Sequence, residues 1–70
     1  MERTAVRSTD LAIIGYDAGV STLEIAFKNG GVYQYRQVPE RVFQSLLKAP
    51  SHGRYFNEHI KDRYPTAKVR

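Results

Sequence analysis

The hydrophobic positions of this chain alternate in its first half and recur at helical spacing in its second half. In Leu23-Glu24-Ile25-Ala26-Phe27 every second residue is large and apolar, which is typical of a strand with one buried face. Gly15 interrupts an earlier run of β-forming residues and indicates a bulge or a close contact. The pattern predicts three strands, over residues 10–17, 23–28 and 31–37.

Residues 39–64 predict two short helices. Pro39 suits the first position of a helix, because its missing N–H costs nothing there, and Pro50 ends that helix. Ser51 is a good N-cap for the second helix, which we expect to end at Tyr64-Pro65. The expected buried stripes are Val42, Phe43, Leu46 and Leu47 in the first helix, and Tyr55 or Phe56, Ile60 and Tyr64 in the second.

The predicted fold class is α+β, with a three-stranded antiparallel β-meander followed by two helices packed on one face (β-β-β-α-α). A small sheet is marginal without a layer against it, so the helices must cover it. We expect a flexible N-terminus over residues 1–7, a single domain over residues 8–64 and a basic C-terminal tail over residues 65–70. Without cysteine, the core alone must stabilise a chain that buries only about 60% of its unfolded surface.

The register of the second hairpin decides which face of the sheet Tyr33 and Tyr35 occupy. A two-residue turn would place both rings on the solvent face. A three-residue loop over residues 28–30, with Gly30 left-handed, would pair Ile25 with Tyr33 and place both rings on the core face. We favour the second register because it gives the core enough volume. The expected partners of the two rings are Ile25, Phe43, Leu46 and Phe56.

Charge divides the chain into two parts. Residues 1–27 carry two basic and four acidic residues, a net charge of −2, whereas residues 28–70 carry nine basic and three acidic residues, a net charge of +6. A basic half is expected of a protein that binds a polyanion such as nucleic acid. A well-solvated helical surface produces the same pattern, so both interpretations stay open.

The sequence gives little support for a membrane protein or for an enzyme. No apolar run approaches the roughly 20 residues that span a bilayer, and we expect a cytoplasmic protein. His52 and His59 are seven positions apart with Asp62 nearby, but no motif supplies the three or four convergent ligands that a metal needs. We therefore expect no catalytic residues, no metal site and no cofactor.

Short motifs follow one another from Ser8 to Tyr64. They are Ser8-Thr9, Ile14-Gly15-Tyr16-Asp17, Leu23-x-Ile25-x-Phe27, Gly30, Tyr33-x-Tyr35, Val38-Pro39, Ala49, Ser51-x-Gly53-x-Tyr55-Phe56-Asn57 and Ile60. In this order and spacing the chain resembles the KTSC domain, a short bacterial module named for its occurrence at the C-terminus of some lysyl-tRNA synthetases. The family also occurs as free-standing small proteins. It has no established activity, and its synthetase context implies RNA binding.

Three alternative sets of residues are candidates for contact with tRNA or single-stranded RNA. Exposed Tyr33 and Tyr35 rings would stack bases, each worth about 1–3 kcal/mol, while Lys28 and Arg36 hold phosphates. If the rings are buried, the basic surface is Lys28, Gln34 and Arg36 on the sheet, or Arg54, Lys61 and Arg63 on the second helix. We then expect a structural role for Tyr33, Tyr35, Tyr55 and Phe56.

The alternative function is a protein-interaction or oligomerisation module. A three-stranded meander leaves its first and third strands as exposed edges, and exposed edges pair with other chains.

Gly53 and Asn57 of the second predicted helix are two further residues with expected roles. Glycine at the start of a helix costs about 1 kcal/mol relative to alanine, so Gly53 indicates close backbone approach or ligand access, or a tight turn between the helices. Asn57 is expected to bond to the loop near Asp17.

Overall fold

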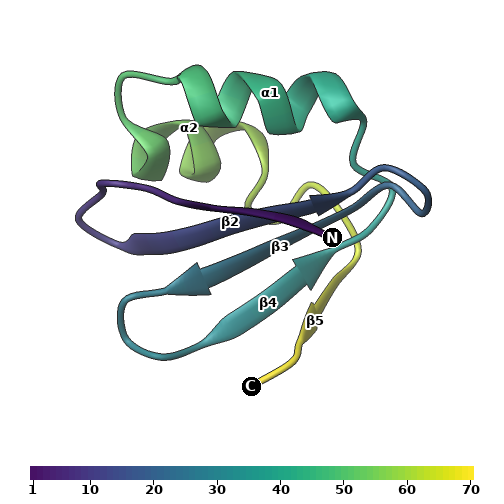
Figure 1. Ribbon diagram of the computed structural model, residues 1–70, viewed down its shortest axis with the longest axis horizontal. Coiled ribbons are helices and arrows are strands. Elements are labelled where there is room, and N and C mark those ends of the chain that lie inside the picture. The colour runs from purple at the N-terminus through teal and green to yellow at the C-terminus, as the bar shows by residue number, and fades with distance from the viewer.

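The computed structural model describes residues 1–70 and consists of two helices on one face of a five-stranded antiparallel sheet (Figure 1). The strands lie in sequence order: β1 (Glu2–Ala5), β2 (Leu11–Asp17), β3 (Thr22–Phe27), β4 (Val32–Tyr35) and β5 (Thr66–Lys68). The helices α1 (Glu40–Lys48) and α2 (His52–His59) follow one another between β4 and β5. The α+β class and the helical layer are as predicted.

The prediction of a three-stranded sheet is wrong, because both ends of the chain add a strand. β1 pairs with β2, and β5 pairs with β4, each in an antiparallel ladder. The two added strands are short, and all their residues are exposed. They join the sheet mainly through backbone hydrogen bonds, which leave no apolar alternation in the sequence. The strands predicted to be exposed edges, β2 and β4, are therefore covered.

The predicted three-residue register of the β3–β4 hairpin is confirmed. Ile25 pairs with Tyr33, and the Phe27 amide donates to the Gly31 carbonyl at 2.8 Å. Gly30 has a φ of 99°, a conformation that costs glycine little. The irregularity predicted near Gly15 lies earlier in β2, where the register shifts between Leu11 and Ile13.

The core lies between the sheet and the two helices. Its buried hydrophobic residues are Leu11, Ile14, Tyr16, Leu23, Ile25, Tyr35, Val38, Phe43, Leu46, Phe56 and Ile60. Tyr35 is 5% exposed, whereas Tyr33 is half-buried at the margin of this core. Tyr16 stacks on Phe43, with ring centroids 4.9 Å apart. The ring stacked on Phe43 thus comes from β2, although we expected Phe43 to pack with the tyrosines of β4.

The helix boundaries follow from local chemistry. Ser51 caps α2 as predicted, its Oγ accepting from the Arg54 amide at 3.2 Å. Pro39 is the N-cap of α1 rather than its first residue. The second helix ends at His59, before the predicted Tyr64, because Asp62 adopts a φ of 62° and the chain turns back toward the sheet. That turn allows β5 to reach β4.

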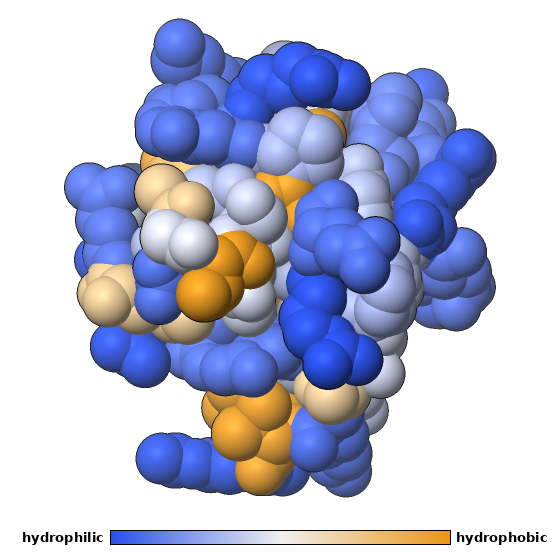
Figure 2. Space-filling view, turned by 90° about the vertical axis from the view of Figure 1, so that its right-hand side faces the viewer, coloured by the Kyte–Doolittle hydropathy of each residue, from blue (hydrophilic) through white to orange (hydrophobic).

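Few large hydrophobic side chains reach the surface. Those exposed are Met1, Ile13, Val20 and Val69. The side of the molecule in Figure 2 is mostly hydrophilic, with its hydrophobic residues in separate spots. Neither helix has the length and apolar character that a membrane-spanning segment requires.

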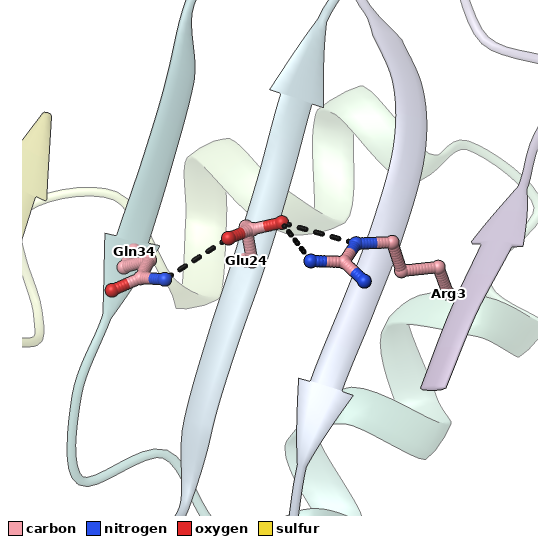
Figure 3. A network of polar contacts seen from close by, with 3 residues as sticks. All are labelled: Arg3, Glu24 and Gln34. Atoms are coloured by element: carbon pink, nitrogen blue, oxygen red, sulfur yellow. Dashed lines mark hydrogen bonds and ion pairs between the residues drawn. The ribbon is translucent and has the colours of Figure 1, made fainter. Parts of the chain in front are cut away.

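A polar network crosses the face of the sheet opposite the helices (Figure 3). Arg3 of β1 reaches over β2 to Glu24 of β3, with Nε and Oε2 3.3 Å apart, and Gln34 Nε2 of β4 donates to Glu24 Oε1 at 3.0 Å. A Cβ at Gly15 would lie 3.1 Å from Arg3 Cγ and 3.0 Å from Met1 Sδ. Gly15 therefore leaves the space through which Arg3 crosses its neighbouring strand, the close contact that its position indicated.

Truncating Tyr35 should destabilise the protein severely. Removing a buried aromatic side chain costs about 3–5 kcal/mol, against the total of about 5–15 kcal/mol typical of a domain. We expect Tyr35→Ala to be unfolded or nearly so in a thermal melt, and Tyr35→Phe, which keeps the ring, to melt close to the parent. A native-like melt for Tyr35→Ala would contradict the buried position of this ring.

Candidate functional site

A groove lies between α2 and the end of the β3–β4 hairpin. Its volume is about 750 Å³, within the range of about 300–1,000 Å³ usual for small-molecule sites. The start of β2 and the turn after α2 complete its walls. The groove is thus built by segments from both halves of the chain.

Aromatic rings form the apolar wall of the groove. Phe27 lies edge to face with Tyr33 at 5.7 Å and with Phe56 at 5.5 Å, and Phe56 contacts Tyr35 in the same way at 5.5 Å. Such pairs are each worth about 0.5–1.5 kcal/mol beyond the area they bury. All four rings line the groove, together with Leu11. The wall is therefore rigid and belongs partly to the core.

Backbone contacts fix the hairpin side of the groove. The Lys28 amide donates to the Asp10 carbonyl at 2.8 Å, which ties the base of the hairpin to the start of β2. Ser8 Oγ accepts from the amides of Asp10 and Leu11, each at 3.3 Å, and shapes the approach to that strand. Asn29 Oδ1 accepts from the Gly31 amide at 2.9 Å and orders the loop. Lys28 and Asn29 consequently sit on a constrained turn.

The charges around the groove are balanced. Lys28 and Lys61 line it together with Asp10 and Asp62. None of the four belongs to an ion pair within the chain. Uncharged polar side chains lie among them, namely Thr9, Asn29, Asn57 and Thr66. The groove therefore offers hydrogen-bond donors and acceptors as well as an apolar wall.

Tyr35 brings a phenol to the groove from the core. Burial raises the pKa of this phenol to about 12, and nearby Tyr33 and Asp62 act in the same direction because a phenolate would face negative charge. The ordinary tyrosine pKa is about 10. The Tyr35 hydroxyl therefore stays neutral and able to donate a hydrogen bond across the physiological pH range.

The structure divides each of the two surfaces that were proposed from the sequence, one on the sheet and one on the second helix. Lys28 and Lys61 share the groove, although they belong to different sets in the sequence analysis. Gln34 lies on the opposite face, bonded to Glu24. Arg54 pairs with Glu58 along α2, with Nε and Oε2 3.4 Å apart.

The other candidates lie outside the groove. Arg36 and Arg63 are exposed and make no ion pair within the chain. Tyr55 packs against His59 of the same helix in a tilted arrangement, with ring centroids 4.4 Å apart, and lines no part of the groove. Of the four aromatic residues proposed as structural, Tyr33, Tyr35 and Phe56 meet at the groove.

Gly53 and Asn57 also line the groove. A Cβ added at Gly53 would lie 3.7 Å from Asp10 Oδ2 and 3.9 Å from Ser8 Oγ, which is ordinary contact and not a clash. A small side chain would therefore fit at Gly53 in contact with Asp10 and Ser8, and the backbone there does not approach another segment too closely for a Cβ. We expected Asn57 to bond to the loop near Asp17. It makes no such bond and lines the groove instead.

Several groove residues had no role in the sequence analysis. Thr9 appeared there only within the motif Ser8-Thr9, and Asp10 only as the first residue of the strand expected over residues 10–17, although both precede β2 and line the groove. Asp62 and Thr66 reach the groove because the chain turns at Asp62, and no residue pattern predicted that turn.

The chain belongs to the KTSC domain family, whose model matches residues 7–64. It is 42% identical over 64 residues to an uncharacterized protein of Stutzerimonas stutzeri, covering 91% of this chain and 90% of that one. It is 43% identical over 49 residues to a lysine–tRNA ligase of Nostoc punctiforme, covering 70% of this chain and 9% of the ligase. The crystal structure of a KTSC domain protein from Yersinia pestis superposes with a TM-score of 0.95 at 40% identity, covering 99% of this chain and 97% of that one.

The raised pKa of Tyr35 predicts a loss of stability in alkaline solution. Between about pH 10 and about pH 12 the unfolded chain has released the Tyr35 proton while the folded chain retains it, so the free energy of unfolding falls as pH rises. The Tyr35→Phe variant has no hydroxyl at this position, so its free energy of unfolding lacks the pH dependence that the Tyr35 hydroxyl causes. Urea unfolding at several pH values in that window should show a steeper decline for the parent than for Tyr35→Phe. Parallel declines would contradict the shift.

Proposed function

We propose that this domain is a non-catalytic cytoplasmic module that binds RNA through the groove between α2 and the β3–β4 hairpin. The observation that carries the proposal is the convergence of Lys28 and Lys61, from distant parts of the chain, on a groove walled by aromatic rings. Cations that neutralise phosphates beside aromatic rings that stack on bases are the usual components of a single-strand binding surface.

Two further observations support RNA as the partner. Residues 28–70 carry a net charge of +6, from nine basic and three acidic residues, and this part of the chain contains α2, β4 and β5. The related segment in the Nostoc punctiforme protein belongs to an enzyme named for lysine and tRNA. We extend that context to the present chain as part of the proposal.

Self-association through sheet edges has weaker support. The edges are β1 and β5, which span four and three residues. Very short edge strands are a common means of preventing edge-to-edge pairing.

Removing either groove lysine should weaken RNA binding and its salt dependence together. Each phosphate contact on a single strand contributes about 0.7 to the slope of log affinity against log salt. We expect Lys28→Gln and Lys61→Gln each to lower that slope by about this amount in titrations with tRNA and single-stranded RNA.

Lys48→Gln is the matched control, because Lys48 is exposed in the last turn of α1 and lies outside the groove. An equal effect of all three variants would point to nonspecific charge attraction. Absence of saturable binding at low salt would end the proposal.

A further inference from the structure

Two equally buried tyrosines differ in whether their hydroxyl groups form a hydrogen bond within the chain. Tyr16 and Tyr35 are each 5% exposed. The Tyr16 hydroxyl donates to the Val38 carbonyl at 2.5 Å. The Tyr35 hydroxyl makes no hydrogen bond within the chain, and the residue lines the groove. No side-chain polar atom shielded from solvent lacks a hydrogen-bond partner in this protein, so the unbonded Tyr35 hydroxyl is open to solvent at the groove. An accessible hydroxyl without a protein partner is free to bond to a group bound there.

The balance of charge narrows the chemistry of that group. Two lysines and two aspartates line the groove, so it is not a simple anion site. A wholly apolar ligand would contact the aromatic wall and make no use of these four exposed charged groups. The groove suits a planar molecule whose faces are apolar and whose edge carries both donors and acceptors.

A nucleobase has these properties. Its face can stack on an aromatic side chain, and its exocyclic amino groups are donors that carboxylates accept. We propose that the groove receives one unpaired base of a single-stranded RNA, with an acceptor on the base edge facing the Tyr35 hydroxyl. Asp10 or Asp62 accepts from the base, and Lys28 and Lys61 hold the flanking phosphates. This inference rests on the proposed function and adds that the base itself is bound.

Base entry requires that the target be unpaired. In a duplex the base edges are engaged with the opposite strand and the faces are stacked, so a duplex can contact only the rim lysines. Gly53 lines the proposed base site. A Cβ built there would already contact Asp10 Oδ2 at 3.7 Å and Ser8 Oγ at 3.9 Å, so a larger side chain at this position would compete with a bound base.

The test compares a short single-stranded RNA with its abasic counterpart and with a duplex of the same sequence, by fluorescence polarisation. The abasic strand keeps the phosphates and loses the bases. We expect the parent to bind the intact single strand more tightly than either of the others. Tyr35→Phe should weaken binding of the intact strand roughly threefold to tenfold, the effect of one lost hydrogen bond, and leave the abasic strand unaffected.

Tyr16→Phe is the matched control, because it removes the same atom from an equally buried ring outside the groove. It should lower the melting temperature, through loss of the bond to Val38, and leave RNA affinity unchanged. Gly53→Leu provides a second variant that fills the groove without removing a core residue. It should weaken binding of the intact strand more than tenfold while the protein stays folded.

The outcomes separate the two proposals. Equal affinity of the parent for intact and abasic strands, with no effect of Tyr35→Phe, would overturn the base site while RNA binding stands. Absence of binding to every RNA would overturn the proposed function and the base site with it.

Discussion

The packing of Phe56 between α2 and the sheet is the interaction on which the arrangement of this domain most depends. Its ring meets Phe27 of β3 and Tyr35 of β4 edge to face, each at 5.5 Å, and so holds α2 against two strands at once. A short helix is unstable alone and needs such packing to persist. Because α2 is one wall of the groove and the rings are another, this contact both closes the core and shapes the candidate site.

The polar side chains on the two sides of the sheet differ in whether they have partners within the chain. On the open face, Glu24 is bonded to Arg3 and Gln34, so its polar groups already have partners within the chain. At the groove, Lys28, Lys61 and the Tyr35 hydroxyl have none. Free polar groups beside an aromatic wall distinguish the groove from the rest of the surface, and this contrast leads us to place binding there.

Much of the fold could be predicted because local chemistry specifies it. The left-handed Gly30 and the volume needed by the core selected the register of the β3–β4 hairpin, and Ser51 marked the start of α2. β1 and β5 could not be predicted, because their residues are exposed and their pairing comes from the backbone. The end of α2 was missed because it depends on the left-handed conformation of Asp62, a residue that adopts it less often than glycine.

The candidate site was predictable only in part, because it is a product of tertiary structure. Lys28 and Lys61 were both singled out from charge, but nothing in their sequence positions placed them together. Gly53 indicated either ligand access or tight packing, and the distances around it, which are those of ordinary contact with Asp10 and Ser8, favour neither. Gln34 looked like a free polar residue on the sheet, whereas its partner Glu24 lies on the neighbouring strand.

The most direct test of the groove as the binding site is to map amide chemical shifts while single-stranded RNA is added. We expect the shifting amides to cluster at the hairpin loop over residues 28–30, at the start of α2 around Gly53, and at the turn around Asp62. Amides next to Arg3, Glu24 and Gln34 on the opposite face should stay in place. Shifts confined to that opposite face, or scattered over every basic residue, would contradict it.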